Sequence, residues 1–278
     1  LVVKGHNQVY QSPKNRWRDL AHYLWITFPA VYRNNIIYVV VSFLLFALPL
    51  VGTWAMILDD VKVAHLELQP GHPIVSDELF AYVERKQLWT DAAQEQSPAA
   101  SSFIATNNIR VCLLSFVGGI SFGLITVYVL ITNGISIGGV FAACQLHDMA
   151  LRLAAFVAPH GVFELSAIWI SGGAGLLMAK GMLFPGQYKR ADSIKLTARP
   201  AFTMFAGCIP LLLIAGTIEG FISPRTDIPQ EAKYIVSTAT LIVLLMYLFI
   251  PRKWPSQELK PEIIISADEP LAQLPQSK

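Results

Sequence analysis

Long uncharged apolar runs are the feature that most constrains this chain. Ile36–Leu58 and Val111–Ile131 contain no charged residue, and each is about as long as a helix that crosses the hydrocarbon core of a bilayer. Only 14% of the residues are charged, whereas a soluble domain carries roughly 25%. Because so few charges cannot cover the surface of a soluble globule of this size, the composition argues against a soluble enzyme, a disordered chain and a disulfide-rich secreted module. It predicts a membrane protein.

The predicted fold class is all-α: a polytopic transmembrane helical bundle of about six spans. The predicted spans are residues 36–58, 109–131, 134–149, 162–183, 200–222 and 234–250. They form one transmembrane domain, 36–250, which is preceded by a segment of interfacial helices, 1–35, and followed by a disordered proline-rich tail, 251–278. An outer loop, 59–108, lies between the first two spans. The path of residues 134–161 is left open between one span, a short span with an interfacial helix, and a re-entrant pair.

The distribution of basic residues predicts the orientation, because Lys and Arg concentrate in short cytoplasmic loops. Segments 1–35 and 180–199 each contain five basic residues, whereas the outer loop contains three against eight acidic residues. Six spans then place both termini in the cytoplasm and the outer loop outside.

Two helices are predicted outside the spans. Between Lys14 and Arg33, apolar side chains recur at helical spacing, at Trp17, Leu20, Ala21, Leu24, Phe28 and Val31. This pattern is typical of an amphipathic elbow helix on the inner leaflet, with Pro29 bending the chain before the first span; a short helix packed against a missing N-terminal domain is the alternative. In the outer loop, Ser76 predicts the start of a short helix that runs to Trp89.

Ionisable residues in or near spans are costly, so each is a candidate functional group. On the predicted topology six polar side chains lie at one depth, near the outer boundary: Asn107, Asn108, Arg110, His160, Glu164 and Glu219. Glu164 is placed at a helix N-terminus after a break at Pro159–Gly161, and Arg110 is expected to pair with Glu164 or Glu219. The cluster is either a structural network of ion pairs and hydrogen bonds or a contact for a substrate or partner.

No enzyme, cofactor or metal site is predicted. The motifs HExxH, GxSxG and GxxxxGK[ST] are absent from the sequence. His160 and Glu164 are four residues apart, but the predicted helix break separates them and no second histidine stands near. The net charge of +2 gives no reason to expect a nucleic-acid partner. The three cysteines fall in apolar stretches and are predicted to be core residues.

Small residues four apart predict close helix packing in the second, third and fourth spans. The pairs are Gly119 with Gly123, Gly134 with Gly138, and Ser171 with Gly175. This spacing fits helix contacts within one chain and helix contacts in a homo-oligomer equally well.

Several ordered motifs resemble the stage II sporulation protein M family. They are Thr106–Arg110, Asn133–Gly134, Pro159–Leu165, Gly172–Leu176, Pro185–Gly186 and Ile218–Pro224. The resemblance covers about residues 1–223, and the first residues are similar to a segment internal to longer members, which implies further N-terminal residues. It implies a multi-spanning protein of the bacterial cytoplasmic (inner) membrane without established enzyme activity. In spore formers the namesake acts in a complex with cell-wall hydrolases during engulfment.

Two functions are therefore expected first. The favoured one is a non-catalytic scaffold in the lipid bilayer that assembles or localises membrane or envelope partners, among them cell-wall (peptidoglycan-remodelling) hydrolases. The alternative is a membrane carrier or lipid-handling transporter that uses the Arg, Glu and His residues of the outer cluster. An intramembrane metalloenzyme is the third and least favoured hypothesis.

Overall fold

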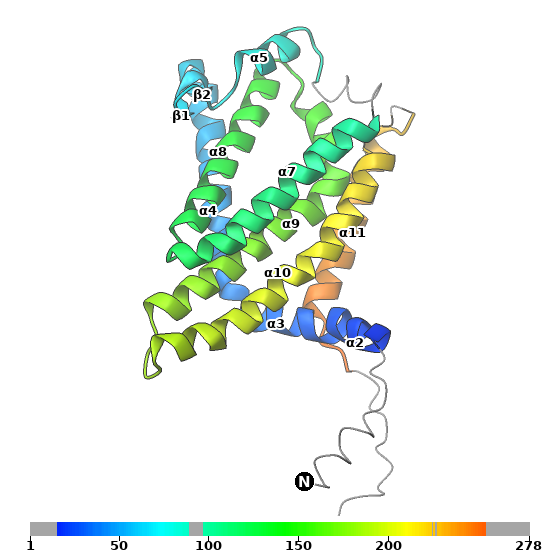
Figure 1. Ribbon diagram of the computed structural model, residues 1–278. Helices are drawn as coiled ribbons and strands as arrows, with labels where there is room; N and C mark the ends of the chain where they lie inside the picture. Colours follow the sequence, from blue (N-terminus) through cyan, green and yellow to red (C-terminus); the bar gives the residue numbers. More distant parts are fainter. Residues whose placement is uncertain (1–15, 89–96, 224, 226, 254–278) are drawn as a thin grey trace, which may run out of the picture.

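The computed structural model describes residues 16–88, 97–223, 225 and 227–253 and is an all-α bundle with one short β-hairpin in this part of the chain (Figure 1). Its long helices are α4 (Ile36–Asp59), α7 (Ser97–Val117), α8 (Leu124–Leu146), α9 (Ala150–Leu183), α10 (Arg190–Phe221) and α11 (Gln230–Phe249). Of these, α4, α8, α9, α10 and α11 are long and apolar enough to cross a membrane. The protein is thus a multi-pass membrane protein. The predicted tail beyond Lys253, residues 1–15 and the predicted helix end at Trp89 lie outside the described residues.

Helix α9 is the centre of the bundle. It packs against α4, α7, α8, α10 and α11, and 67% of its most apolar stretch is buried, against 17% for α11. The core around it contains the large, fully buried side chains of Phe28, Phe46, Leu130, Ile170 and Met204. The neighbours of α9 therefore form a layer around it, each with one face against protein and one face left for lipid.

The predicted spans 109–131 and 134–149 are wrong, because the chain reverses direction inside the first of them. Helix α7 ends at Val117, a 3-10 turn occupies Gly118–Ser121, and α8 begins at Leu124. Phe122 and Gly123 both have positive φ, at 58° and 84°, a backbone conformation that ends a helix and that glycine adopts at little cost. Residues 134–146 are the second half of α8, so this part of the segment left open above belongs to a single long helix.

The predicted helix break at residues 159–161 is also wrong. Helix α9 continues from Ala150 through Pro159 to Leu183. A proline removes one backbone hydrogen bond, but a helix packed among other helices tolerates that loss. Glu164 therefore lies well inside α9 and not at a helix N-terminus.

The N-terminal segment is helical and crosses the end of the bundle opposite the outer loop (Figure 1). It consists of α2 (Arg16–His22), a π-helical turn (Tyr23–Thr27) and α3 (Phe28–Asn34), and α3 packs on α10 and α11. Pro29 occupies the first turn of α3, where its missing N–H is tolerated. The predicted apolar face of this segment is buried only in part: Phe28 is fully buried, whereas Trp17 is 80% exposed.

The outer loop contains a small folded unit, residues 60–88, which we name the outer module. It comprises a 3-10 helix, η2 (Val61–His65), the hairpin of β1 (Glu67–Gln69) and β2 (His72–Pro73), and α5 (Asp77–Glu84). The predicted helix start is confirmed, since the Ser76 hydroxyl oxygen accepts from the backbone N–H of Leu79 at 3.2 Å. Two small cores join the module to α4, α8 and the start of α9: Ile57, Ala64, Val75, Ala142 and Ala143 in one, and Val83, Leu88, Cys144, Met149 and Leu153 in the other.

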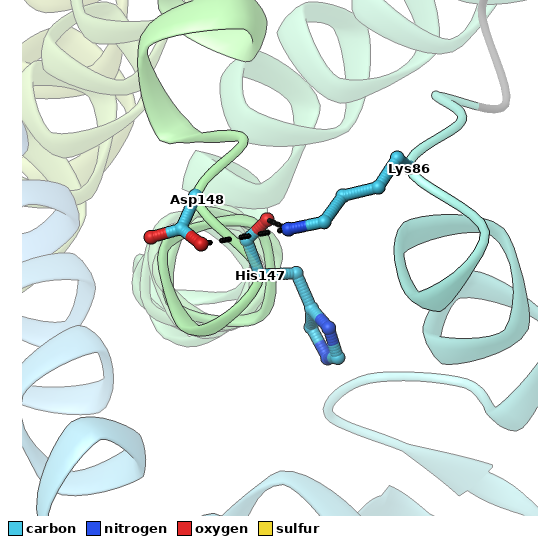
Figure 2. Close-up of polar contacts among 3 residues, drawn as sticks. All are labelled: Lys86, His147 and Asp148. Atoms are coloured by element: carbon cyan, nitrogen blue, oxygen red, sulfur yellow. Dashed lines mark hydrogen bonds and ion pairs between the residues drawn. The ribbon is translucent and has the colours of Figure 1, made fainter.

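Polar contacts fasten the end of the outer module to the turn between α8 and α9 (Figure 2). The Lys86 ammonium group donates to the backbone carbonyl of His147 and lies 3.5 Å from the Asp148 carboxylate. In return, Arg152 donates to the carbonyl of Lys86 at 3.1 Å. The module is therefore held both by apolar burial and by directional bonds.

The two ends of the bundle differ in charge. One end is formed by α2, α3, the α9–α10 turn and the residues that follow α11 (Figure 1). We name it the basic end, because it carries Arg16, Arg18, Arg33, Lys180, Lys189, Arg190, Lys195, Arg199, Arg252 and Lys253. The opposite end carries the outer module, in which most charged side chains are acidic.

Candidate functional site: a buried polar cluster

Polar side chains from four helices meet inside the bundle toward the outer-module end. Helix α9 supplies His160 and Glu164, α10 supplies Glu219, and Ser223 lies two residues beyond the end of α10. The remaining members are Asn108 of α7 and Lys233 of α11. We name these six residues the buried polar cluster. All except Asn108 are at most 8% exposed.

A chain of contacts runs through one half of the cluster. His160 Nδ1 lies 2.7 Å from Ser223 Oγ, and Lys233 Nζ donates to the Ser223 backbone carbonyl at 2.7 Å. On its other side His160 Nε2 lies 3.9 Å from Glu164 Oε2, and the Asn108 side chain hydrogen-bonds to the Glu164 carboxyl group. Because α9 is unbroken, His160 and Glu164 lie one turn apart on the same face. These contacts link the outer parts of α7, α9, α10 and α11.

Glu219 differs from the other members. It is 1% exposed, and neither of its carboxyl oxygens has a hydrogen-bond partner among the described residues. Glu164, another acidic residue, lies close enough to act on it electrostatically. Since buried polar groups are normally satisfied, an orphan carboxyl group inside a membrane bundle is a candidate binding group.

The structure assembles part of the predicted cluster and leaves two residues out. Asn107 and Arg110 are exposed, and no ion pair of Arg110 with Glu164 or Glu219 occurs in the described chain. The reason is the phase of α7: Val111, Cys112 and Ser115 are buried, so the face that contains Asn107 and Arg110 points outward.

Ser223 and Lys233 were not predicted as cluster members. Lys233 stands just before the predicted sixth span, and a lysine in the first turn of a membrane helix is a signal that would have found it. Ser223 lies within the family-like motif Ile218–Pro224 but carries no charge, so nothing in its chemistry distinguishes it from other boundary serines.

Below the cluster, small residues bring backbones into contact. A Cβ added at Gly134 or Gly138 would overlap a carbonyl oxygen of α4, those of Phe46 and Leu50 respectively. Gly119, in the α7–α8 turn, lies directly against Gly175, and Gly123 in the same turn faces Ala179. Ser171 hydrogen-bonds to Cys208 of α10 at 3.4 Å. Gly119 and Gly123 therefore serve a tight turn and not one helix face.

The chemistry open to the cluster is binding and proton exchange by carboxyl, imidazole and amine groups. Among the described residues, no three His, Cys, Asp or Glu side chains are grouped so that they could hold a metal ion. The three cysteines of the chain are buried and free.

The fold and the cluster define a class: polytopic helical membrane proteins with ionisable groups enclosed between the helices. Residues 36–224 match the family described as stage II sporulation protein M, and the chain belongs to that family. An uncharacterized protein of Methanocaldococcus jannaschii is 35% identical over 124 residues, which cover 44% of this chain and 70% of that relative. No solved structure matches the chain.

Proposed function

We propose that this protein is a non-catalytic scaffold of the cytoplasmic membrane that holds envelope proteins in a complex, with the outer module as its docking surface. The observation that carries the proposal is the attachment of this module. It is fixed to α4, α8 and α9 by two apolar cores and by the contacts of Lys86 and Arg152. A surface held in this way is preorganised, which lowers the entropy lost when a partner binds.

The charge of the module favours a basic partner. Its three basic residues, Lys62, Arg85 and Lys86, are outnumbered by exposed acidic residues in and beside it: Asp59, Asp60, Glu67, Asp77, Glu78 and Glu84. Complementary charge steers association and selects partners. The family resemblance points to cell-wall hydrolases as the class of partner, and we propose a hydrolase with a basic surface.

Affinity purification in mild detergent, read by mass spectrometry, tests this proposal. The full-length protein at native expression level is compared with the double variant Glu78→Lys, Glu84→Lys, in which two exposed acids of α5 are reversed. We expect at least a tenfold loss of envelope partners, which corresponds to about 1.4 kcal/mol. The matched control is Lys62→Glu, which changes charge in the same module but makes it more acidic, and should retain the partners.

Recovery of the protein without envelope partners would contradict the scaffold, as would equal recovery with wild type and the Glu78→Lys, Glu84→Lys variant. Recovery without envelope partners would instead favour a function inside the membrane.

A carrier is the second candidate function, and the orphan carboxyl group of Glu219 favours it. A buried acid without a partner, next to Glu164, is an arrangement that binds a proton or a polar solute during transport. To test this, bound water-soluble solutes are extracted from purified wild-type protein and from purified Glu219→Gln, and the two extracts are compared. A carrier predicts a solute in wild type that is absent from Glu219→Gln, with equal thermal stability. No solute in either protein, with an altered melting temperature for the variant, indicates a structural role.

A further inference from the structure

A groove lies between α10 and α11 on the lipid-facing side of the bundle. Both helices pack on α3 and α9 in preference to each other, which leaves a space of about 380 Å³. Aliphatic and aromatic side chains dominate its wall, including Phe163, Pro210, Ile214 and Val243. The groove extends from the middle of α9 and α10 to the basic end, where Leu24 and Trp25 of the N-terminal segment line it.

Arg252 is the single charged residue among those that line this groove. Its guanidinium group donates to the carbonyls of Tyr247 at 2.8 Å and Met246 at 3.1 Å, and it lies 4.3 Å from the centroid of the Trp25 ring. These contacts fix the group at the mouth of the groove. A guanidinium group has five N–H donors, so donors remain for a ligand. No carboxylate lies within ion-pair distance of Arg252 in the described part of the chain.

The surroundings match the position of a lipid headgroup. Trp25 and Tyr247 flank Arg252, and such aromatic side chains concentrate where a membrane helix meets the interface. The basic end carries most of the positive charge of the bundle, and positive charge marks the cytoplasmic leaflet, which is rich in anionic lipids. An apolar channel with one fixed cation at its interfacial end therefore complements an acyl chain joined to a negatively charged phosphate.

We propose that this groove binds one anionic phospholipid, with an acyl chain between α10 and α11 and the phosphate at Arg252. The lipid fills the space that the two helices leave open and connects the N-terminal segment to α11. This site is separate from the buried polar cluster and from the outer module, and it does not depend on the proposed function.

Native mass spectrometry of the full chain in detergent tests the proposal, with added dioleoyl phosphatidylglycerol or dioleoyl phosphatidylcholine as the probe. We expect one phosphatidylglycerol to be retained, with phosphatidylcholine bound more weakly. Arg252→Gln should lower phosphatidylglycerol occupancy about tenfold, as loss of a charge-assisted hydrogen bond does. Lys253→Gln is the matched control, because Lys253 is the adjacent exposed cation and does not line the groove.

A second variant separates lipid binding from the role of Arg252 at the end of α11. Ile214→Trp fills the groove and leaves Arg252 in place, so it should lower retention of both lipids. Equal phosphatidylglycerol binding by wild type and Ile214→Trp would overturn the proposal, as would equal losses for Arg252→Gln and Lys253→Gln. A dimer that Ile214→Trp disrupts would also overturn it, since a second protein copy would then occupy the groove.

Discussion

Whether a side chain of α7 points into the bundle depends on its angular position around the helix, and depth in the membrane does not decide it. Asn108 and Arg110 lie two positions apart at the same level of α7, yet Asn108 reaches Glu164 and Arg110 is exposed. In a soluble helix the polar face would reveal this phase, but here polar side chains lie on both faces of α7, Asn108 on the inner one and Asn107 and Arg110 on the outer one. The sequence therefore predicted the depth of the cluster and not which of its side chains point inward.

Replacement of Gly175 by alanine tests the close backbone packing at this scale. A Cβ at Gly175 would overlap the carbonyl oxygen of Ser115 and lie 2.7 Å from Thr126 Oγ1. We expect Gly175→Ala to destabilise the folded state by about 1–3 kcal/mol, the usual effect of overpacking, measured as a lower melting temperature in detergent. Gly52→Ala is the control, because apart from the adjacent backbone of α4 no described atom lies within 4 Å of a Cβ there. Equal effects of the two substitutions would contradict the packing argument.

The N-terminal segment shows how hydrogen bonds at the scale of elements fix one helix against others. The Tyr23 hydroxyl donates to the carbonyl of Thr203 at 2.7 Å, and Arg33 donates to that of Leu248 at 2.7 Å. From α11, Tyr247 donates to the carbonyl of Leu24. The segment is therefore bonded to both α10 and α11, in addition to the burial of Phe28.

Tyr23 makes this attachment dependent on pH. Burial, with smaller contributions from Cys208 and Tyr247, raises the pKa of Tyr23 from 10.0 to about 12. Because the folded-state pKa is the higher one, the stabilisation is complete below pH 10 and is lost as the pH rises through 12. Tyr23→Phe should lower stability at neutral pH by about 1 kcal/mol through the lost hydrogen bond, and the difference from wild type should shrink above pH 10.

Thermal melts in detergent across this pH range provide the measurement. Tyr188→Phe, at a tyrosine that is 62% exposed, is the matched control and should change nothing. A constant difference between Tyr23→Phe and wild type up to pH 12 would show that Tyr23 does not anchor the segment in its neutral form.

For the whole molecule, the separation of charge between the two ends sets the expected orientation. The basic end should face the cytoplasm and the outer module the opposite side. The three native cysteines are buried, so introduced cysteines can be labelled with little background.

Labelling of whole cells with a membrane-impermeant maleimide tests the orientation. Asp77→Cys, at an exposed site of the outer module, should react in intact cells, whereas Arg190→Cys, at the exposed start of α10, should react only after permeabilisation. Reaction of Arg190→Cys alone in intact cells would indicate the opposite orientation. Reaction of both cysteines in intact cells would contradict the predicted topology.

Much of this protein follows from the sequence because a bilayer restricts what an apolar chain can form. Uncharged runs had to become helices, since only helices and closed barrels satisfy their backbone groups in lipid. That argument gave the all-α bundle, the first span and the level of His160, Glu164 and Glu219. The start of α5 followed separately from Ser76 as a helix-capping residue. The motifs gave the family, which the match over residues 36–224 establishes.

Only the tertiary structure decided where helices end and which side chains meet. No charged residue interrupts Gly118–Gly123, so the sequence predicts a continuous span across a turn that depends on positive φ. Pro159 predicts a helix end, although packing around α9 compensates for its missing hydrogen bond. The isolation of Glu219, the bonds of Lys233 and the groove at Arg252 depend on neighbours far apart in the chain. Local sequence does not contain that information, because contacts between helices are set by their relative rotation and depth.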